Sequence, residues 1–395
     1  MNLIGPVFAM TYRTSVSRGP GGYEAVREHW EALAADARLF TQLPEWLENI
    51  GSDGVSWLVV TEDDRPVAAA ALSVQKVRIC GKSVRALSGV RQSIDDTYGH
   101  GLTLGALAIA DPKADGEAVA DALIAGYRQS CGNWDVLWLS DVREPSPWLS
   151  ARFGQVVPEE GVGAPIIETN QPSSQYWAAA SGHLRHVLSA SRRRLEKEGR
   201  QSQVVEARTP GEVADAFDQF VDLEGRGWKR DVGAFANRPE SAAFVKRFLV
   251  SAARTRRAAV RSLLIDGHLA ACHLSVQVQD TLFLMKITYD ESLQHLSPGN
   301  LLMAELISKA CDDQTIARID CVELASWHHR WSTITEPMFR LVAFTPRSAT
   351  GLAAEVAWRG LGALGKQPSH LNKPAVVELI SPEQVHLPSG RDAKP

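Results

Sequence analysis

Cysteine is scarce in this chain, and its cysteines follow neither a metal-binding nor a disulfide pattern. The 395 residues contain five cysteines, at positions 80, 131, 272, 311 and 321, and no two of them form a Cys-x-x-Cys pair. Zinc sites and disulfide frameworks usually need closely spaced or even-numbered cysteines. The sequence therefore predicts no metal site and favours reduced, mostly buried thiols.

The chain also lacks a long hydrophobic run and a strong charge of either sign. No stretch approaches the ~18 apolar residues of a membrane-spanning helix. The first residues, MNLIGPVFAMTYR, have no basic segment and are interrupted by Gly5-Pro6, so they predict neither a signal peptide nor an anchor. A net charge of −4 gives no general attraction to nucleic acid. We expect a cytoplasmic protein that does not bind DNA, and leave a peripheral membrane contact open.

The residues that are present suffice for two hydrophobic cores. Hydrophobic residues make up 45% of the chain and charged residues 22%, as in soluble globular proteins. A length of 395 residues exceeds the usual ~100–200 residues of one domain. The Pro- and Gly-containing stretch 156–174 indicates a connection between two halves. We predict domains at 1–165 and 172–365, followed by a loosely ordered tail at 366–395.

Both halves contain the same order of secondary-structure signals, without a sequence repeat: helices, an antiparallel meander, a helix and a strand. In the first half we expect helices at 22–37, 40–50 and 116–130, a hairpin at 56–79 and a strand at 134–142. In the second half we expect a strand at 202–208, helices at 182–200, 209–229 and 239–255, a three-stranded meander at 257–290, a helix from Ser297, and strands at 317–322 and 339–346. Thr209 is the expected cap of the second helix, and the first should turn inward the residues Leu184, Leu188, Ser191 and Leu195. The first turn of this meander is Asp266-Gly267, a strong hairpin dipeptide.

The stretch SPGN opens a helix directly after the strand TLFLMKITYD. Ser297 suits the N-cap and Pro298 the first helical position. Gly299 costs the helix about 1 kcal/mol relative to alanine, but it lets a ligand approach the backbone. A helix start offers unbonded N–H groups and a positive dipole end to anions. We predict that this segment holds a pyrophosphate through Ser297, Pro298, Gly299, Asn300 and Leu301; a helix start without a ligand is the alternative.

Five segments of the second half recur in a characteristic order: RRRLEKEG (192–199), LEGRGWK (223–229), IDGHLAACHLSV (265–276), KITYDESLQHLSPGNLL (286–302) and IDCVELASWHHRW (319–331). With them, the chain resembles the acetyltransferase family associated with bacterial cellulose and exopolysaccharide loci (CelD/BcsL-like). That family belongs to the GNAT superfamily of N-acetyltransferases and is related to the Fem-type aminoacyltransferases. The early segment WEALAADARLFTQLPEWLENI also resembles the opening of the family.

The resemblance implies an α+β fold of two tandem GNAT-like domains, each a mixed, mostly antiparallel sheet flanked by helices. It implies a GNAT-type N-acetyltransferase that takes an acyl group from acetyl-CoA or another acyl-CoA, bound by the second domain. The acceptor would be an amine or hydroxyl of a cell-surface polysaccharide or glycan precursor. The chain departs from the family in two places: HLSPGN has one glycine in the pyrophosphate loop, and Trp327-His328 replaces a Tyr-Lys pair before Trp331.

Two other functional classes stay open. One is a Fem-type transferase that depends on aminoacyl-tRNA; a local excess of 17 Lys+Arg over 11 Asp+Glu in residues 171–270 fits it weakly. The other is a catalytically inactive GNAT-like pair that acts as a binding module in an export complex. The acceptor, the choice between N- and O-acylation, the acyl chain length and the oligomeric state are not predicted.

Acyl transfer to an amine needs a base that takes the ammonium proton and a donor that stabilises the oxyanion. Glu224, beside Gly225 and Gly227, is the first candidate base, with a salt bridge to Lys229 or Arg226 as the alternative. Tyr289 is a candidate proton donor to the leaving thiolate. His328 is a candidate acid or base, with an ordinary pKa near 6.5.

Candidate acceptor contacts are Trp228, Lys229, Arg193 and Trp327. Trp228 is as well explained by a core position. The three arginines 192–194 point in different directions around a helix, so only one or two could face an anionic acceptor such as a nucleotide- or lipid-diphosphate-linked sugar. A solvated helix face is the alternative.

Overall fold

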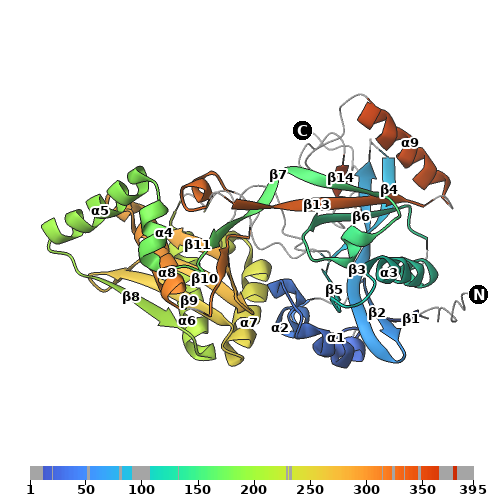
Figure 1. Ribbon diagram of the computed structural model, residues 1–395, viewed down its shortest axis with the longest axis horizontal. Helices are drawn as coiled ribbons and strands as arrows, with labels where there is room; N and C mark the ends of the chain where they lie inside the picture. The colour runs from blue at the N-terminus through green and yellow to red at the C-terminus, as the bar shows by residue number, and fades with distance from the viewer. Residues whose placement is uncertain are drawn as a thin grey trace, which may run out of the picture.

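The computed structural model describes residues 12–19, 21–50, 54–79, 82–90, 107–131, 133–227, 230, 234–313, 315–322, 325–332, 334–345, 348–363 and 377–379. Within these residues, strands from both halves of the chain belong to one 14-stranded sheet. Figure 1 shows two lobes connected by the strands β7 and β13. We call residues 12–150 the N-terminal lobe and residues 173–322 the C-terminal lobe.

The N-terminal lobe packs helices against a mostly antiparallel run of strands. Its strands are β1 (Tyr12–Arg18), β2 (Val55–Glu62), β3 (Arg65–Ile79), β4 (Lys82–Gly89), β5 (Ala108–Ala110) and β6 (Val136–Val142). Its helices are η1 (Glu24–Val26), α1 (Arg27–Ala34), η2 (Phe40–Gln42), α2 (Pro44–Leu47), α3 (Gly116–Ser130) and η4 (Pro147–Ser150).

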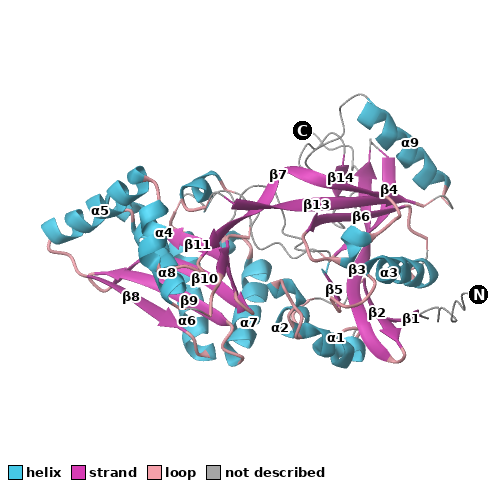
Figure 2. Ribbon diagram, in the orientation of Figure 1, coloured by secondary structure: helices cyan, strands magenta, loops and turns pink. Residues whose placement is uncertain are grey.

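The C-terminal lobe has helices on both faces of its strands, as Figure 2 shows. Its strands are β8 (Ser202–Ala207), β9 (Ala258–Ile265), β10 (His268–Val278), β11 (Thr281–Tyr289) and β12 (Arg318–Asp320). Its helices are α4 (Ser173–Ala179), α5 (Gly182–Lys197), α6 (Pro210–Glu224), η6 (Phe235–Asn237), α7 (Pro239–Arg254), η7 (Glu291–Leu296) and α8 (Pro298–Asp312).

The remaining elements join or flank the lobes: β7 (Gln155–Glu168), η8 (Ser326–Arg330), β13 (Ile334–Phe344), α9 (Ala349–Ala363) and β14 (Val377–Leu379). The strand order is β1-β2-β3-β4-β6-β13-β7-β12-β11-β10-β9-β8. β13 therefore pairs with β6 of the first half, although it comes late in the chain. The mixed α+β class with a large, mostly antiparallel sheet flanked by helices is confirmed, and the domain boundaries 1–165 and 172–365 stay a prediction.

Local sequence signals account for most helices of the C-terminal lobe. The buried face of α5 is the predicted one and consists of Leu184, Leu188, Ser191 and Leu195. After the helix, the backbone at Gly199 is left-handed, with a φ of +65°. α6 begins with a capping box in which Thr209 and Glu212 bond each other's backbone. α6 and α7 pack on one face of β9–β11, while α5 and α8 pack on the other.

Two expectations are corrected, and two elements were not predicted. Residues 155–168 form the long strand β7 rather than a connecting loop, because β13 and β12 pair with it despite its prolines. Ser297 occupies the N-cap of α8 but has a left-handed backbone, and its side chain makes no capping bond. The sequence signals missed β1 and α9. Of the described helices, none has both the length and the apolar character needed to cross a membrane.

Candidate active site

A pocket opens where two parallel strands of the C-terminal lobe part. β11 and β12 pair over only three positions, from Thr281 with Arg318 to Phe283 with Asp320. Beyond this point β11 continues to Tyr289, whereas β12 ends. A pocket of about 340 Å³ lies in the resulting gap, lined by β11 residues 284–289, the start of α8 and the loop that carries η8.

The loop that carries η8 is attached to β7 at both ends. At its start, the Cys321 N–H donates to the Pro165 carbonyl at 3.0 Å. At its end, the Ser332 hydroxyl donates to the Ile166 carbonyl, and Ile334 pairs with Ile166 as β13 begins. The loop is thus an excursion between two adjacent positions of β7, and it forms one wall of the pocket.

A bulge in β11 decides which way Lys286 points. Lys286 pairs with Leu274, and Leu284 pairs with the next residue of β10, so Met285 is an extra residue in β11. Side chains alternate between the faces of a strand, and an extra residue reverses the alternation. As a result Leu284 packs toward α8, whereas Lys286 points toward α6.

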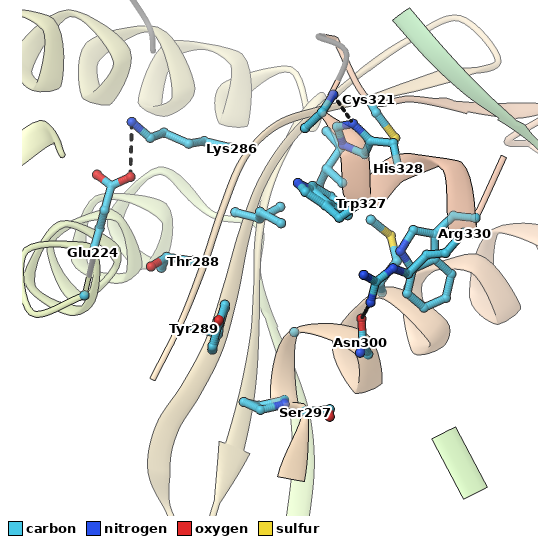
Figure 3. Close-up of a pocket in the computed structure, with 18 of the residues that line it drawn as sticks. Glu224, Lys286, Thr288, Tyr289, Ser297, Asn300, Cys321, Trp327, His328 and Arg330 are labelled. Carbon is cyan, nitrogen blue, oxygen red and sulfur yellow. Dashed lines mark hydrogen bonds and ion pairs between the residues drawn. The ribbon is translucent and has the colours of Figure 1, made fainter. Parts of the chain in front are cut away.

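Lys286 and Glu224 form a buried ion pair at one side of the pocket (Figure 3). The Lys286 Nζ lies 3.1 Å from Glu224 Oε1 and 4.0 Å from the centre of the Phe235 ring. The other carboxylate oxygen accepts the Phe235 N–H at 2.8 Å. Glu224 is the last residue of α6, and its partner Lys286 comes from β11.

The start of α8 lies at another side of the pocket. The backbone N–H groups of Asn300 and Leu301 donate to the Ser297 carbonyl at 3.0 and 3.1 Å. A Cβ added to Gly299 would lie 3.6 Å from the Tyr289 ring, an ordinary contact distance. The Arg330 guanidinium reaches the same helix turn, with Nη1 3.4 Å from Asn300 Oδ1 (Figure 3). A cation and a helix start are therefore adjacent at the pocket.

His328 is buried in the pocket wall, with its ring centre 3.7 Å from that of Trp327. Its Nδ1 accepts the Ala325 N–H at 3.0 Å, so in the neutral ring the proton is on Nε2. Burial, helped by the neighbouring His329, lowers the pKa of His328 to about 4. The ring is therefore neutral near pH 7, and its Nε2–H is able to donate a hydrogen bond.

His328→Gln should lower turnover without changing the shape of its pH profile. We expect a loss of about 2- to 12-fold, the value of one neutral hydrogen bond. Because the pKa of His328 is about 4, the ring does not titrate at higher pH. The neutral ring contributes stability above its ordinary pKa of about 6.5, and this contribution is lost as the pH falls toward 4. Initial rates of both proteins from about pH 5.5 to 8 test this, and an inflection near 6.5 that the variant lacks would contradict it.

The structure brings most of the predicted site residues together. Those that line the pocket are Glu224, Tyr289, Ser297, Pro298, Gly299, Asn300, Trp327 and His328. Leu301 is buried in the core between α5 and α8 instead. Arg193 is exposed on α5, outside the pocket lining. Trp228 and Lys229 lie outside the described residues.

Sequence reasoning missed several polar residues that line the pocket, among them Lys286, Cys321 and Arg330. A lysine within the apolar run TLFLMKITY was a usable signal, because a charge in a buried strand is rarely left without a partner. Burial raises the pKa of the Cys321 thiol well above its ordinary value, with a smaller contribution from Asp320. The thiol is therefore not an activated nucleophile.

Comparisons with known proteins agree with this architecture. Residues 182–326, which include β8–β12, α8 and most of the pocket lining, match the family described as acetyltransferase (GNAT) domain. No curated protein matches the chain in sequence.

Two solved structures share the fold across both lobes. One is the C-terminal domain of a protein from Agrobacterium fabrum described as a lysylphosphatidylglycerol synthetase, with 11% identity, a TM-score of 0.50, and coverage of 85% of this chain and 97% of that chain. The other is FemX, with 9% identity, a TM-score of 0.50, and coverage of 82% of this chain and 96% of that chain. The chain therefore shares its two-lobed fold with these structures, and its residues 182–326 match a GNAT acetyltransferase domain.

Proposed function

We propose that the protein transfers an acyl group from acyl-CoA to an amine or a hydroxyl of an acceptor. The observation that carries the proposal is the pocket between the diverging strands β11 and β12, with the start of α8 beside it. An acyl-CoA has an extended chain with two amides and a pyrophosphate. A strand segment at residues 284–289, a helix start and the Arg330 guanidinium provide complementary groups for these parts.

Gly299 and Arg330 would hold the phosphates. The absence of a side chain at Gly299 leaves the backbone of the first helical turn open to an anion. Arg330 supplies a cation within reach of the same turn. Backbone groups of β11 residues 284–289 would bond the amides of the donor, as an added strand does.

The chemistry requires proton transfer and charge stabilisation around the thioester. The bulge at Met285 takes its backbone out of register with β10, so its amide is a candidate donor to the developing oxyanion. Tyr289 is the candidate proton donor to the leaving thiolate. Glu224 is the candidate base, with Lys286 fixing its position.

For the acceptor, we propose a cell-surface glycan precursor, with acetyl as the acyl group; the resemblance to the exopolysaccharide-associated family supports this choice. Trp327 lines the pocket and offers an aromatic surface suited to a sugar ring.

One observation favours a polyanionic partner as a second candidate. The C-terminal part of α5 lies beside η7, because the Arg194 Nη1 donates to the His295 carbonyl at 2.6 Å. This hydrogen bond gives Arg194 a structural role, whereas the side chains of Arg192 and Arg193 are exposed on the same helix. An aminoacyl-tRNA donor would fit an exposed basic helix near the pocket better than acyl-CoA would.

Salt dependence separates the two candidates. We expect calorimetry to detect acetyl-CoA binding that weakens less than about tenfold between 50 and 200 mM salt, since few charges are involved. Arg193→Ala should leave the acetyl-CoA affinity unchanged. Arg192→Ala removes the neighbouring exposed arginine of the same helix and should give the same result. Binding of unfractionated tRNA that falls about 10³- to 10⁵-fold over the same range, without acetyl-CoA binding, would favour the second candidate. Binding of neither ligand would favour a non-catalytic binding module.

A further inference from the structure

An arginine of the N-terminal lobe reaches the strand that borders the pocket. Arg143 directly follows β6, and its side chain is only 3% exposed. Its Nη2 lies 2.5 Å from Asp320 Oδ2 and 2.8 Å from Glu336 Oε2. Asp320 is the last residue of β12, and Glu336 belongs to β13, where it also bonds Arg318. Arg143 thus joins the N-terminal lobe to the point where β12 ends.

Asp320 in turn bonds the residue that bends the chain. Its second oxygen, Oδ1, accepts the Val322 N–H at 2.7 Å. Val322 has a φ of +64° and is 1% exposed. A β-branched residue is strained in this left-handed conformation, which glycine adopts without strain. Such strain persists only where the surroundings enforce it.

The bend at Val322 marks where the chain leaves β11. The chain is paired with β11 up to Asp320, whereas its pairing with β7, which begins at Arg318, continues through the bond from the Cys321 N–H to the Pro165 carbonyl. The loop after Val322 carries Ala325, Trp327 and His328 to the opposite wall of the pocket. The loop that forms this wall therefore begins at a strained residue whose N–H one carboxylate binds.

We propose that Arg143 is a positioning residue for the acyltransferase pocket. By fixing the Asp320 carboxylate, it keeps Val322 in its left-handed conformation and so holds the loop that follows β12 apart from β11. The N-terminal lobe thereby contributes to donor binding without touching the donor. This inference rests on the proposed function for its ligand, acyl-CoA, and on the contacts above for its geometry.

The geometry specifies which variants are informative. Both bonds of Arg143 to carboxylates come from one nitrogen, Nη2, so the single ammonium of Arg143→Lys can reproduce part of the arrangement. Arg143→Met removes the bonds and keeps an apolar chain of similar length. Adding Val322→Gly to Arg143→Met should make the left-handed bend free of strain, although it also removes a buried side chain.

The test measures acetyl-CoA affinity by calorimetry and unfolding by urea for each variant. We expect Arg143→Met to weaken acetyl-CoA affinity about 5- to 30-fold, because that range corresponds to the usual cost of one residue in the left-handed conformation. Arg143→Lys should recover part of the loss. Arg143→Met/Val322→Gly should bind more tightly than Arg143→Met, although it unfolds at a lower urea concentration. Opposite changes in affinity and stability would not result from a purely structural role.

A ligand-free measurement separates this inference from the proposed function. Hydrogen exchange at Val322 and residues 325–331 should accelerate in Arg143→Met, while β9 and β10 stay protected. The matched control is Arg261→Met, which removes a buried arginine paired with Glu206 outside the pocket and should leave exchange in this loop unchanged. Faster exchange in Arg143→Met without acetyl-CoA binding by the wild type would overturn the proposed function alone. Unchanged exchange in this loop would overturn the positioning role.

Discussion

Glu224→Gln is expected to impair both turnover and stability. Turnover should fall about 10²- to 10⁴-fold, the usual contribution of a general base. The substitution also leaves the Lys286 ammonium in a buried site without its carboxylate, and removing one partner of such a pair costs about 3–5 kcal/mol of unfolding free energy. Steady-state rates and urea unfolding of the same preparation measure the two effects.

The double variant Glu224→Gln/Lys286→Met separates the two effects. An uncharged pair of similar volume is often about as stable as the buried ion pair it replaces, so stability should return close to that of the wild type. Turnover should stay low if Glu224 is the base. Recovery of turnover in the stable double variant would mean that Glu224 serves only to neutralise Lys286.

A second ion pair provides the control for these measurements. Glu206 is bonded to Arg261 at 2.8 Å, and neither residue lines the pocket. Glu206→Gln should therefore lower stability and leave turnover per folded molecule unchanged. A comparable loss of turnover in this control would show that destabilisation alone inactivates the protein.

Gly299→Val is expected to remove most acyl-CoA binding while leaving the protein folded. The Cβ of the new side chain would lie 3.6 Å from the Tyr289 ring, an ordinary contact distance, so we expect the fold to accept it. Its methyl groups would occupy the space through which an anion reaches the backbone of the first turn. Loss of one or two charge-assisted bonds should weaken acetyl-CoA binding about 10- to 10³-fold by calorimetry.

Another helix of the same lobe supplies a matched control for Gly299→Val. α6 begins with Pro210-Gly211 as α8 begins with Pro298-Gly299, and no atom lies within 4 Å of a Cβ added at Gly211. Gly211→Val therefore makes the same change at the same helical position away from the pocket, and acetyl-CoA affinity should not change. Equal affinities of the folded Gly299→Val protein and the wild type would contradict a pyrophosphate site at α8.

Local signals predicted the parts of this fold that depend on local physics. The inward face of α5, the Thr209 cap of α6 and the Asp266-Gly267 turn each follow from residues within one element. The pocket residues near Ser297-Pro298-Gly299 were found in the same way. The left-handed backbone of Ser297 was not predicted, because it depends on how η7 packs before α8.

The parts that were missed depend on contacts between distant residues. Glu224 pairs with Lys286 because a bulge in β11 turns that lysine toward α6, and no spacing in the sequence encodes a bulge. β7 was taken for a connection because Pro158, Gly163 and Pro165 are poor strand residues. It forms because β12 and β13, which come much later in the chain, pair with it.

The position of β13 between β6 and β7 also constrains the order in which the chain can fold during synthesis. The register of β6 with β13 joins Val142 to Phe339, and residues 143–333 lie between the two strands. Until the ribosome has released β13, one edge of β6 and one edge of β7 have no partner. Unpaired edges are where strands pair wrongly or aggregate, and distant pairing slows folding. A strand that is translated late therefore closes the middle of the sheet, and a nascent chain stalled before residue 334 exposes two open strand edges at once.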